Sequence, residues 1–247
     1  MNKYHYILII ILFTFTGCSS ISVHEKMKGQ LCEAFNEDSI PLLNLFFEEW
    51  HKSKKPFSDF EFNYASDTVK MIYKVFNNFC NREIEKNPGY YNSHYCIIQN
   101  QIKYQISTLE HLNYPIPDSC ILISKTITDF RPFPNKIKNK TVYKSKLYDS
   151  VLEDFIKSDC GKENETKYYD LTWRGWPRAN FLEQVVHIRA AMMGFSYQTL
   201  PFVSLDFNKN MNEVIIHSSL ASSWTSELFV LSEGKWKFIK SFYTSVN

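Results

Sequence analysis

Apolar residues recur at intervals of three and four positions in the middle of the chain, from Ser66 to Glu85. The repeated positions are Val69, Ile72, Tyr73, Phe76, Phe79 and Cys80. Residues with this spacing share one face of an α-helix. The pattern therefore predicts an amphipathic helix that Ser66 or Asp67 caps and that Pro88-Gly89 ends.

The same spacing predicts three further helices. The first follows Asp38 or Ser39 and stops at the Lys-rich segment 52–55 before Pro56. The second covers about Ser145–Lys157, and a shorter one follows a loop that extends from Cys160 through Pro177. Its apolar positions are Phe181, Leu182, Val185 and Val186.

Alternation of apolar and polar residues predicts strands elsewhere. Two such segments are Ile98–Ser107 and Cys120–Asp129. After position 200 three or four alternating segments follow one another, and short turns at 208–210, 221–223 and 232–235 separate them. This order indicates an antiparallel meander with one apolar face.

The predicted fold class is α+β, with helices packed on a C-terminal antiparallel β-meander. This order of elements resembles the NTF2-like and cystatin-like folds, and that resemblance implies a curved sheet wrapped around a helix. We expect residues 36–247 to form a single α+β domain, with a weak boundary near residues 130–142, where Pro and Lys accumulate.

The N-terminus has the features of a secretory signal peptide, residues 1–17. Lys3 precedes an apolar run that is shorter than the roughly 20 residues needed to span a bilayer, and Gly17 stands directly before Cys18. This junction resembles the lipobox of bacterial lipoproteins, although Phe15 stands where that motif usually has an aliphatic residue. The resemblance implies that Cys18 is lipidated, with palmitate as one of its acyl chains, and anchors the protein in a membrane.

The region from about Tyr64 onward is also similar to uncharacterised Gram-negative envelope lipoproteins. Three short matches carry this similarity: Ile97-Ile98-Gln99-Asn100, the helix start from Arg178 to Val185, and Glu233-Gly234-Lys235-Trp236. It implies a cell-envelope location, which we take to be the outer membrane, but no particular activity. Residues 18–35 are expected to form the lipid anchor and a polar tether.

Charge narrows the range of partners. The formal net charge of the 247 residues is only +2, and Lys and Glu are interspersed along the chain instead of forming blocks. Nucleic-acid-binding proteins usually carry a basic stripe and a much higher net charge, so a nucleic-acid partner is not expected.

Five cysteines remain once Cys18 is assigned to the lipid. An envelope compartment permits disulfides, but an odd number leaves at least one free thiol, and spacing alone does not fix the pairing. Cys80 and Cys96 flank a predicted turn, so they are the candidate disulfide. Burial of the cysteines as free thiols is an equally good alternative.

Catalytic and cofactor motifs are absent from the sequence. It has no HExxH, no paired CxxC and no EF-hand loop, and its histidines are scattered, so no metal or other cofactor is predicted. It has no GxSxG, SxxK or phosphate-binding loop either. The neighbouring carboxylates Glu83 and Glu85 are expected to be solvated.

Aromatic and cationic residues are concentrated between positions 168 and 178. The candidate binding residues there are Trp173, Arg174, Trp176 and Arg178. Trp and Arg are frequent in binding hot spots, and Trp faces also stack on sugar rings. The alternative is that the Trp residues close the open end of the sheet while the Arg residues cap its edge.

These observations favour a lipid-anchored, non-catalytic binding module for a protein or a glycan. Two alternatives remain open. One is a hydrolase or isomerase whose site is built in an NTF2-like concavity, and the other is an envelope immunity protein that blocks a toxin.

Overall fold

A computed structural model describes residues 22–91, 93–158, 160–161, 176–191, 194–196, 199–220 and 223–246. The α+β class is confirmed, because helices dominate the first part of the chain and an antiparallel meander ends it. The helices are α2 (Val23–Asn36), α3 (Ile40–Ser53), α4 (Asp59–Tyr64), α5 (Asp67–Lys86), η1 (Pro88–Tyr91), η2 (Asp118–Cys120), α6 (Lys146–Lys157) and α8 (Trp176–Glu183). The strands are β1 (Tyr95–Ile98), β2 (Ile102–Ser107), β3 (Ile121–Ile127), β4 (Lys140–Tyr143), β5 (Arg189–Ala191), β6 (Gly194–Ser196), β7 (Phe202–Phe207), β8 (Glu213–Leu220), β9 (Ser223–Ser232) and β10 (Lys235–Val246).

The main sheet of the described residues has the strand order β10-β9-β8-β7-β2-β3. Strands β7 to β10 form the expected meander, in which each strand pairs antiparallel with the next. The hairpin of β2 and β3 joins the meander through a parallel pairing of β2 with β7. Register shifts between β9 and β10 mark bulges, which bend and twist a sheet.

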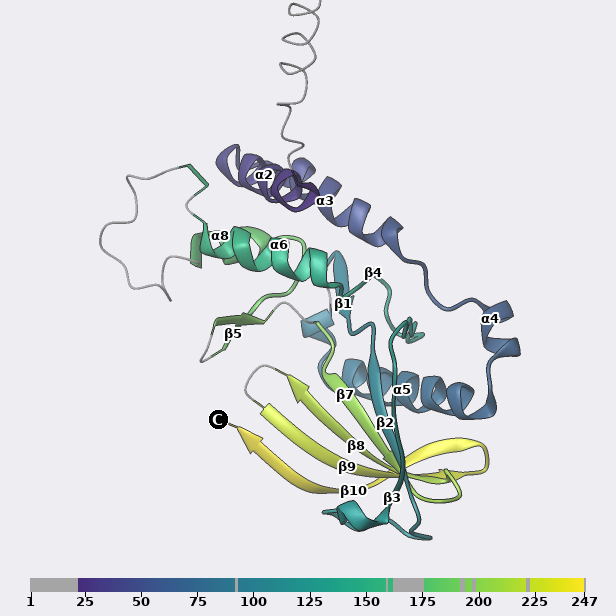
Figure 1. Ribbon diagram of the computed structural model, residues 1–247. Coiled ribbons are helices and arrows are strands. Elements are labelled where there is room, and N and C mark those ends of the chain that lie inside the picture. The colour runs from purple at the N-terminus through teal and green to yellow at the C-terminus, as the bar shows by residue number, and fades with distance from the viewer. Residues whose placement is uncertain are drawn as a thin grey trace, which may run out of the picture.

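Helix α5 lies across one face of this sheet (Figure 1). The Ser66 hydroxyl accepts a hydrogen bond from the Val69 amide and caps the helix, as the sequence predicts. Its buried stripe packs on the inward side chains of the strands to form the first core. The stripe contains Ile72, Tyr73, Val75, Phe76, Phe79, Cys80 and Ile84.

The second core belongs to the helical end of the molecule, where α2, α3, α6 and α8 gather (Figure 1). Strand β1 contributes to both cores, because successive side chains of a strand point to opposite sides. Tyr95 and Ile97 pack in the helical core, whereas Cys96 and Ile98 pack under the sheet. Strand β4 pairs parallel with β1 and extends this connection.

Helix α2 corrects the prediction that residues 18–35 form an anchor and a polar tether. The described part of that segment is helical from Val23, and Met27, Leu31 and Ala34 are buried against the other helices. Their spacing is that of one helix face, but charged residues separate them, and this dilutes the apolar pattern. The signal peptide, residues 1–17, and Cys18 lie outside the described residues.

The weak boundary expected near residues 130–142 falls in an irregular segment, residues 128–139, which β4 follows. Phe130 of this segment is fully buried in the core under the sheet. The short strand β4 pairs with β1, which lies far away in sequence, so a local pattern does not reveal it.

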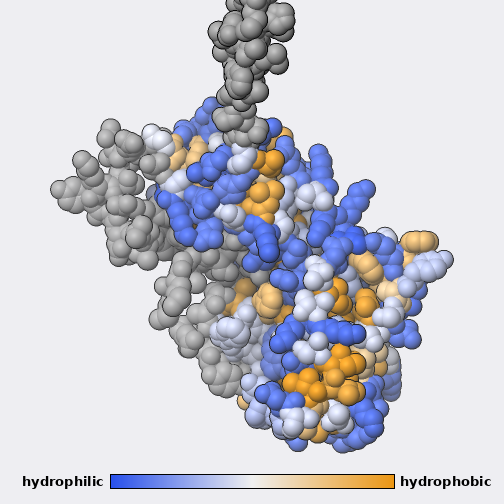
Figure 2. Space-filling model, in the orientation of Figure 1, coloured by the Kyte–Doolittle hydropathy of each residue, from blue (hydrophilic) through white to orange (hydrophobic). Residues whose placement is uncertain are grey.

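The surface shown in Figure 2 is mainly hydrophilic, with an apolar area toward the end of the molecule that contains the sheet. The edge strand β3 carries an exposed Leu122, and Ile121 and Ile123 beside it are partly exposed. None of the described helices is long and apolar enough to cross a membrane.

Candidate functional site

A pocket of about 230 Å³ opens between the C-terminal end of α5 and the adjoining ends of β8 and β9. Helix α5 and the segment after it provide one wall, and the two strands provide the other. The lining residues are Glu83, Asn87, Tyr91, Pro201, Ser218, Leu220, Ser223 and Thr225.

The sequence explains why this end of the fold stays open. Helix α5 is apolar where Phe76 and Phe79 cover the sheet, but its last turns place Glu83 and Asn87, four residues apart, on one side. The facing strand β8 changes in the same way, from Val214 and Ile216 to Ser218 along a single face. Polar side chains therefore meet where the apolar packing ends, and they leave a polar pocket.

Hydroxyl groups form the floor of the pocket. Ser218 and Thr225 lie directly opposite each other on β8 and β9, and their side-chain oxygens are 2.6 Å apart. The next pair toward the end of the sheet is Leu220 with Ser223. The Ser223 hydroxyl donates to the backbone carbonyl of Leu220 at 2.9 Å.

Charges beside the pocket are closely paired. The Glu83 carboxylate lies 2.8 Å from the Lys86 ammonium and 4.0 Å from the Arg82 guanidinium. Arg82 also binds both carboxylate oxygens of Glu227, at 2.6 and 3.2 Å. Two acidic and two basic groups thus form one paired cluster beside the pocket, so the site is polar without a strong net charge.

Glu83 differs from the expectation of a solvated carboxylate. Its side chain is only 19% exposed and lines the pocket, whereas Glu85 is 56% exposed and pairs with Lys136 on the outside of the helix. The two residues point in different directions, as helical geometry requires for positions two apart. The closeness of Glu83 and Glu85 in the sequence therefore does not predict which of these two side chains points toward the sheet.

The predicted binding segment, residues 168–178, lies largely outside the described residues, and so do Trp173 and Arg174. Trp176 opens helix α8 instead of belonging to a loop, because Pro177 is tolerated in the first turn of a helix. The prediction that Arg178 presents its guanidinium to a ligand is wrong. Arg178 is buried, and its Nε donates to the Ile156 carbonyl oxygen at 2.9 Å.

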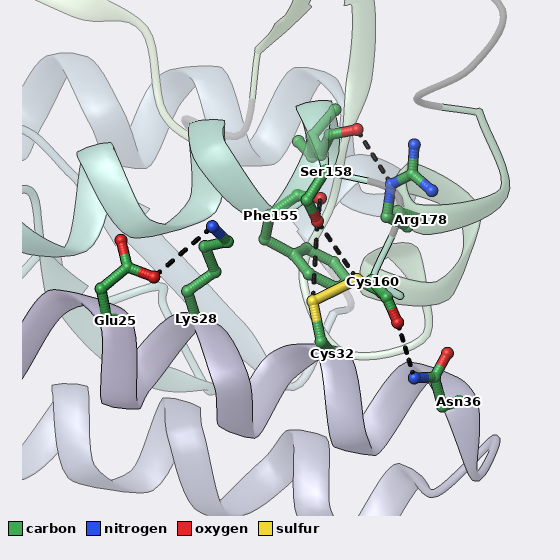
Figure 3. Close-up of a disulfide and its surroundings, with 9 residues drawn as sticks. Glu25, Lys28, Cys32, Asn36, Phe155, Ser158, Cys160 and Arg178 are labelled. Carbon is green, nitrogen blue, oxygen red and sulfur yellow. Dashed lines mark hydrogen bonds and ion pairs between the residues drawn. A yellow bond between two sulfur atoms is a disulfide. The ribbon is translucent and has the colours of Figure 1, made fainter. Parts of the chain in front are cut away.

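The disulfide of the described chain is Cys32–Cys160, which joins α2 to the segment after α6 (Figure 3). The predicted Cys80–Cys96 pair is wrong, since both residues are buried free thiols. Cys80 faces the sheet from α5 and Cys96 projects from β1 into the same core, where both pack as small apolar residues. The alternative of buried free thiols is correct for this pair.

The polar groups around the disulfide fix the neighbouring chain. The Asn36 side chain donates to the Cys160 carbonyl oxygen at 3.0 Å, and the Ser158 hydroxyl oxygen lies 3.2 Å from the Cys160 sulfur (Figure 3). Arg178 lies close to the same segment, where its Nε donates to the Ile156 carbonyl oxygen (Figure 3). The disulfide and these hydrogen bonds therefore hold the segment after α6 against α2 and α8 in the helical core.

Metal binding has no support in the described part of the chain, where no three His, Cys, Asp or Glu side chains gather closely enough to hold an ion.

Comparisons with protein-family models, curated proteins and solved structures found no match for this chain.

Proposed function

We propose that this protein is a lipid-anchored component of a bacterial cell envelope, held at the outer membrane, and that a pocket of its folded part binds a neutral sugar unit of a glycan without catalysis in that pocket. The observation that carries the proposal is the polar pocket between α5 and the ends of β8 and β9. It supports the glycan form of the binding-module hypothesis over the protein form.

The pocket has the size of a site for one ring. Its volume of about 230 Å³ is below the roughly 300–1,000 Å³ of sites that enclose drug-sized ligands. A single sugar residue at the end or at a branch of a glycan fits such a space better than a peptide side chain with its backbone.

The lining chemistry matches sugar hydroxyl groups. Ser218, Ser223 and Thr225 each provide a hydroxyl oxygen that accepts hydrogen bonds, and one hydroxyl of the Ser218–Thr225 pair keeps its hydrogen for a ligand. The Asn87 amide adds donors and an acceptor, and the Glu83 carboxylate adds acceptors. The described residues that line the pocket include no Lys or Arg to hold an anion, so we favour a neutral sugar.

Catalysis in this pocket has less support than binding. Its lining includes Glu83 but no His or Cys, and Lys86 at 2.8 Å holds the Glu83 carboxylate in an ion pair. A general acid and base require two groups placed on either side of a substrate. The hydrolase or isomerase alternative would need a second such group among the lining residues.

The anchor part of the proposal depends on Gly17 and Cys18, which resemble a lipobox. Two structural features are compatible with it. Helix α2 begins at Val23, close behind Cys18, so a lipid on Cys18 would keep the helical end of the fold near the membrane. The Cys32–Cys160 disulfide is typical of an oxidising compartment.

Labelling with radioactive palmitate in a Gram-negative host tests the anchor. The wild-type protein should incorporate label and fractionate with the outer membrane, whereas Cys18→Ala should do neither. Cys120→Ser serves as the control for a cysteine change outside the leader. Equal labelling of the wild type and Cys18→Ala would reject lipidation at Cys18.

A glycan array tests the binding function. Full-length protein in mild detergent is applied to an array of envelope polysaccharides and simple saccharides, beside Thr225→Val and the control Thr126→Val. Thr126 is exposed on β3, away from the pocket lining. We expect the wild type and Thr126→Val to bind the same saccharide, and Thr225→Val to lose about tenfold in affinity, because one hydrogen-bonding hydroxyl is removed.

A further inference from the structure

Three polar side chains form a hydrogen-bonded chain on the face of the sheet that α5 does not cover. Asp206 Oδ2 lies 2.8 Å from His217 Nε2, and His217 Nδ1 lies 2.9 Å from Ser226 Oγ. The order is acid, imidazole and hydroxyl. This is the order of groups that activates a serine nucleophile in many unrelated folds.

The meander brings the three residues together. Val203, Leu205 and Phe207 of β7 point to the buried side, so Asp206 points to the other side. His217 of β8 pairs directly with Ser226 of β9. Short turns therefore place groups from three successive strands next to each other.

The partners of the imidazole fix its tautomer. A carboxylate only accepts hydrogen bonds, so Nε2 carries the proton and donates to Asp206. Nδ1 of the neutral ring is then an acceptor, and it faces the Ser226 hydroxyl. In this state His217 is placed to remove the proton from Ser226 Oγ.

Exposed aromatic side chains and a buried apolar cluster border these three residues. The Tyr114 ring lies 5.7 Å from the His217 ring and is 42% exposed. Leu112, Ile215 and Leu228 form a small buried cluster beside it, with Ile116 and Phe242 packed against them. Trp224, two residues before Ser226 on β9 and therefore on the same face of the sheet, is 54% exposed.

We propose that Ser226 and His217 are catalytic residues for hydrolysis of a carboxylic ester with a short acyl chain, and that Asp206 is a positioning residue. Ser226 Oγ attacks the ester carbonyl carbon while its proton moves to His217 Nδ1. The C–O bond to the alcohol then breaks, and Nδ1 returns the proton to the leaving oxygen. A water molecule attacks the acyl-serine in the same way, which releases the carboxylic acid and restores Ser226.

The expected activity is slow. The pairing of β8 with β7 and β9 engages the backbone N–H groups of these strands in the sheet, so they do not provide an oxyanion hole. Loss of one oxyanion-hole donor costs about 10²–10³ in rate in serine hydrolases. In addition, Ser226 is only 5% exposed, which limits the access of a substrate to its hydroxyl.

The test uses full-length protein in mild detergent with p-nitrophenyl butyrate and, separately, with a fluorophosphonate that labels activated serines. Ser226→Ala, His217→Gln and Asp206→Asn are compared with Ser204→Ala, whose serine pairs with His217 from β7. We expect the wild type and Ser204→Ala to hydrolyse the ester at least about tenfold faster than Ser226→Ala and His217→Gln. Asp206→Asn should lower the rate and change its pH profile, which loss of packing alone would not do.

Mass mapping of the fluorophosphonate adduct gives a result that does not depend on any variant. An adduct on Ser226 of the folded wild type supports the proposal. No adduct on Ser226, or equal ester hydrolysis by the wild type and Ser226→Ala, overturns it. Glycan binding depends on the opposite face of the sheet, so either result leaves the proposed function to its own test.

Discussion

The Arg82 guanidinium of α5 and the Glu227 carboxylate of β9 form a two-point ion pair, with N–O distances of 2.6 and 3.2 Å. Arg82 also lies over the Phe238 ring, 4.1 Å from its centroid. Glu227 is buried and stands two residues from Thr225 of the pocket floor. The pair therefore fixes the distance between the helix and the strand that form the two walls of the pocket.

Removing the carboxylate from this pair should destabilise the fold. We expect Glu227→Gln to lower the free energy of unfolding by about 1–3 kcal/mol, because Arg82 keeps its charge in a partly buried place and retains only the Glu83 carboxylate, 4.0 Å away. Denaturant titration measures the change. The control is Glu233→Gln, whose exposed carboxylate lies 3.6 Å from Lys237 and whose loss should cost less than about 1 kcal/mol. Equal losses in both variants would contradict a special role for Arg82–Glu227.

The cysteine assignment predicts a defined pattern of thiol reactivity. Cys120 is partly exposed and should react with a maleimide in the native protein, whereas Cys80 and Cys96 should react only after unfolding. Burial blocks access to both thiols, and it also raises the pKa of Cys96 to about 12 and raises that of Cys80. Peptide mapping should find Cys32 linked to Cys160. Recovery of a Cys80–Cys96 peptide would contradict the structure.

The disulfide should contribute strongly to stability, because it links residues 128 positions apart. By restricting the unfolded chain, a disulfide that closes a loop of this length increases the free energy of unfolding by about 4–5 kcal/mol. We expect the double variant Cys32→Ser, Cys160→Ser to lose a large part of that amount in thermal or denaturant unfolding. Cys120→Ser, which removes a free thiol, should unfold like the wild type. A double variant as stable as the wild type would show that the helical core does not need this link.

Asp149 of α6 should make stability depend on pH. Burial raises the pKa of its carboxyl from 3.8 to about 6, although Lys144 acts in the opposite direction. The folded state therefore holds the proton more tightly than the unfolded chain. The stabilising effect of protonated Asp149 is present below pH 3.8 and is lost as the pH rises through 6.

Substitution by a neutral side chain removes this dependence. At pH 8 Asp149→Asn should be more stable than the wild type by about 1–3 kcal/mol, and the difference should disappear near pH 4. Unfolding titrations at both pH values check the expectation. A difference of the same size at pH 4 and pH 8 would show that charge on Asp149 is not its cause.

Local patterns predict much of this fold. The apolar stripe of α5 and its Ser66 cap lie within one segment, and short turns separate the strands of the meander. Residues close together in the sequence are therefore enough to predict these elements. The parallel pairs β1–β4 and β2–β7 join distant segments, and no local alternation specifies them. Helix α2 has a real apolar face, but it is narrow and interrupted by charges.

The candidate sites were harder to predict. The pocket needs Glu83 from a helix and Thr225 from a strand far along the chain, and the sequence does not give their distance. The hydrogen-bonded group of Asp206, His217 and Ser226 is only weakly visible in the sequence. Alternation along the meander predicts that all three side chains lie on one face of the sheet. Pairing register decides whether they meet, and a shift of one residue would have separated them.

Hydrogen–deuterium exchange of the full-length protein, with and without the best saccharide from the array, tests the central claim most directly. The account predicts that the saccharide protects the peptides that contain Glu83–Tyr91 and Ser218–Thr225, and that Thr225→Val abolishes this protection while Thr126→Val keeps it. Protection confined to other peptides, or no saccharide that changes exchange at saturating concentration, would contradict glycan binding in the pocket between α5 and the strand ends.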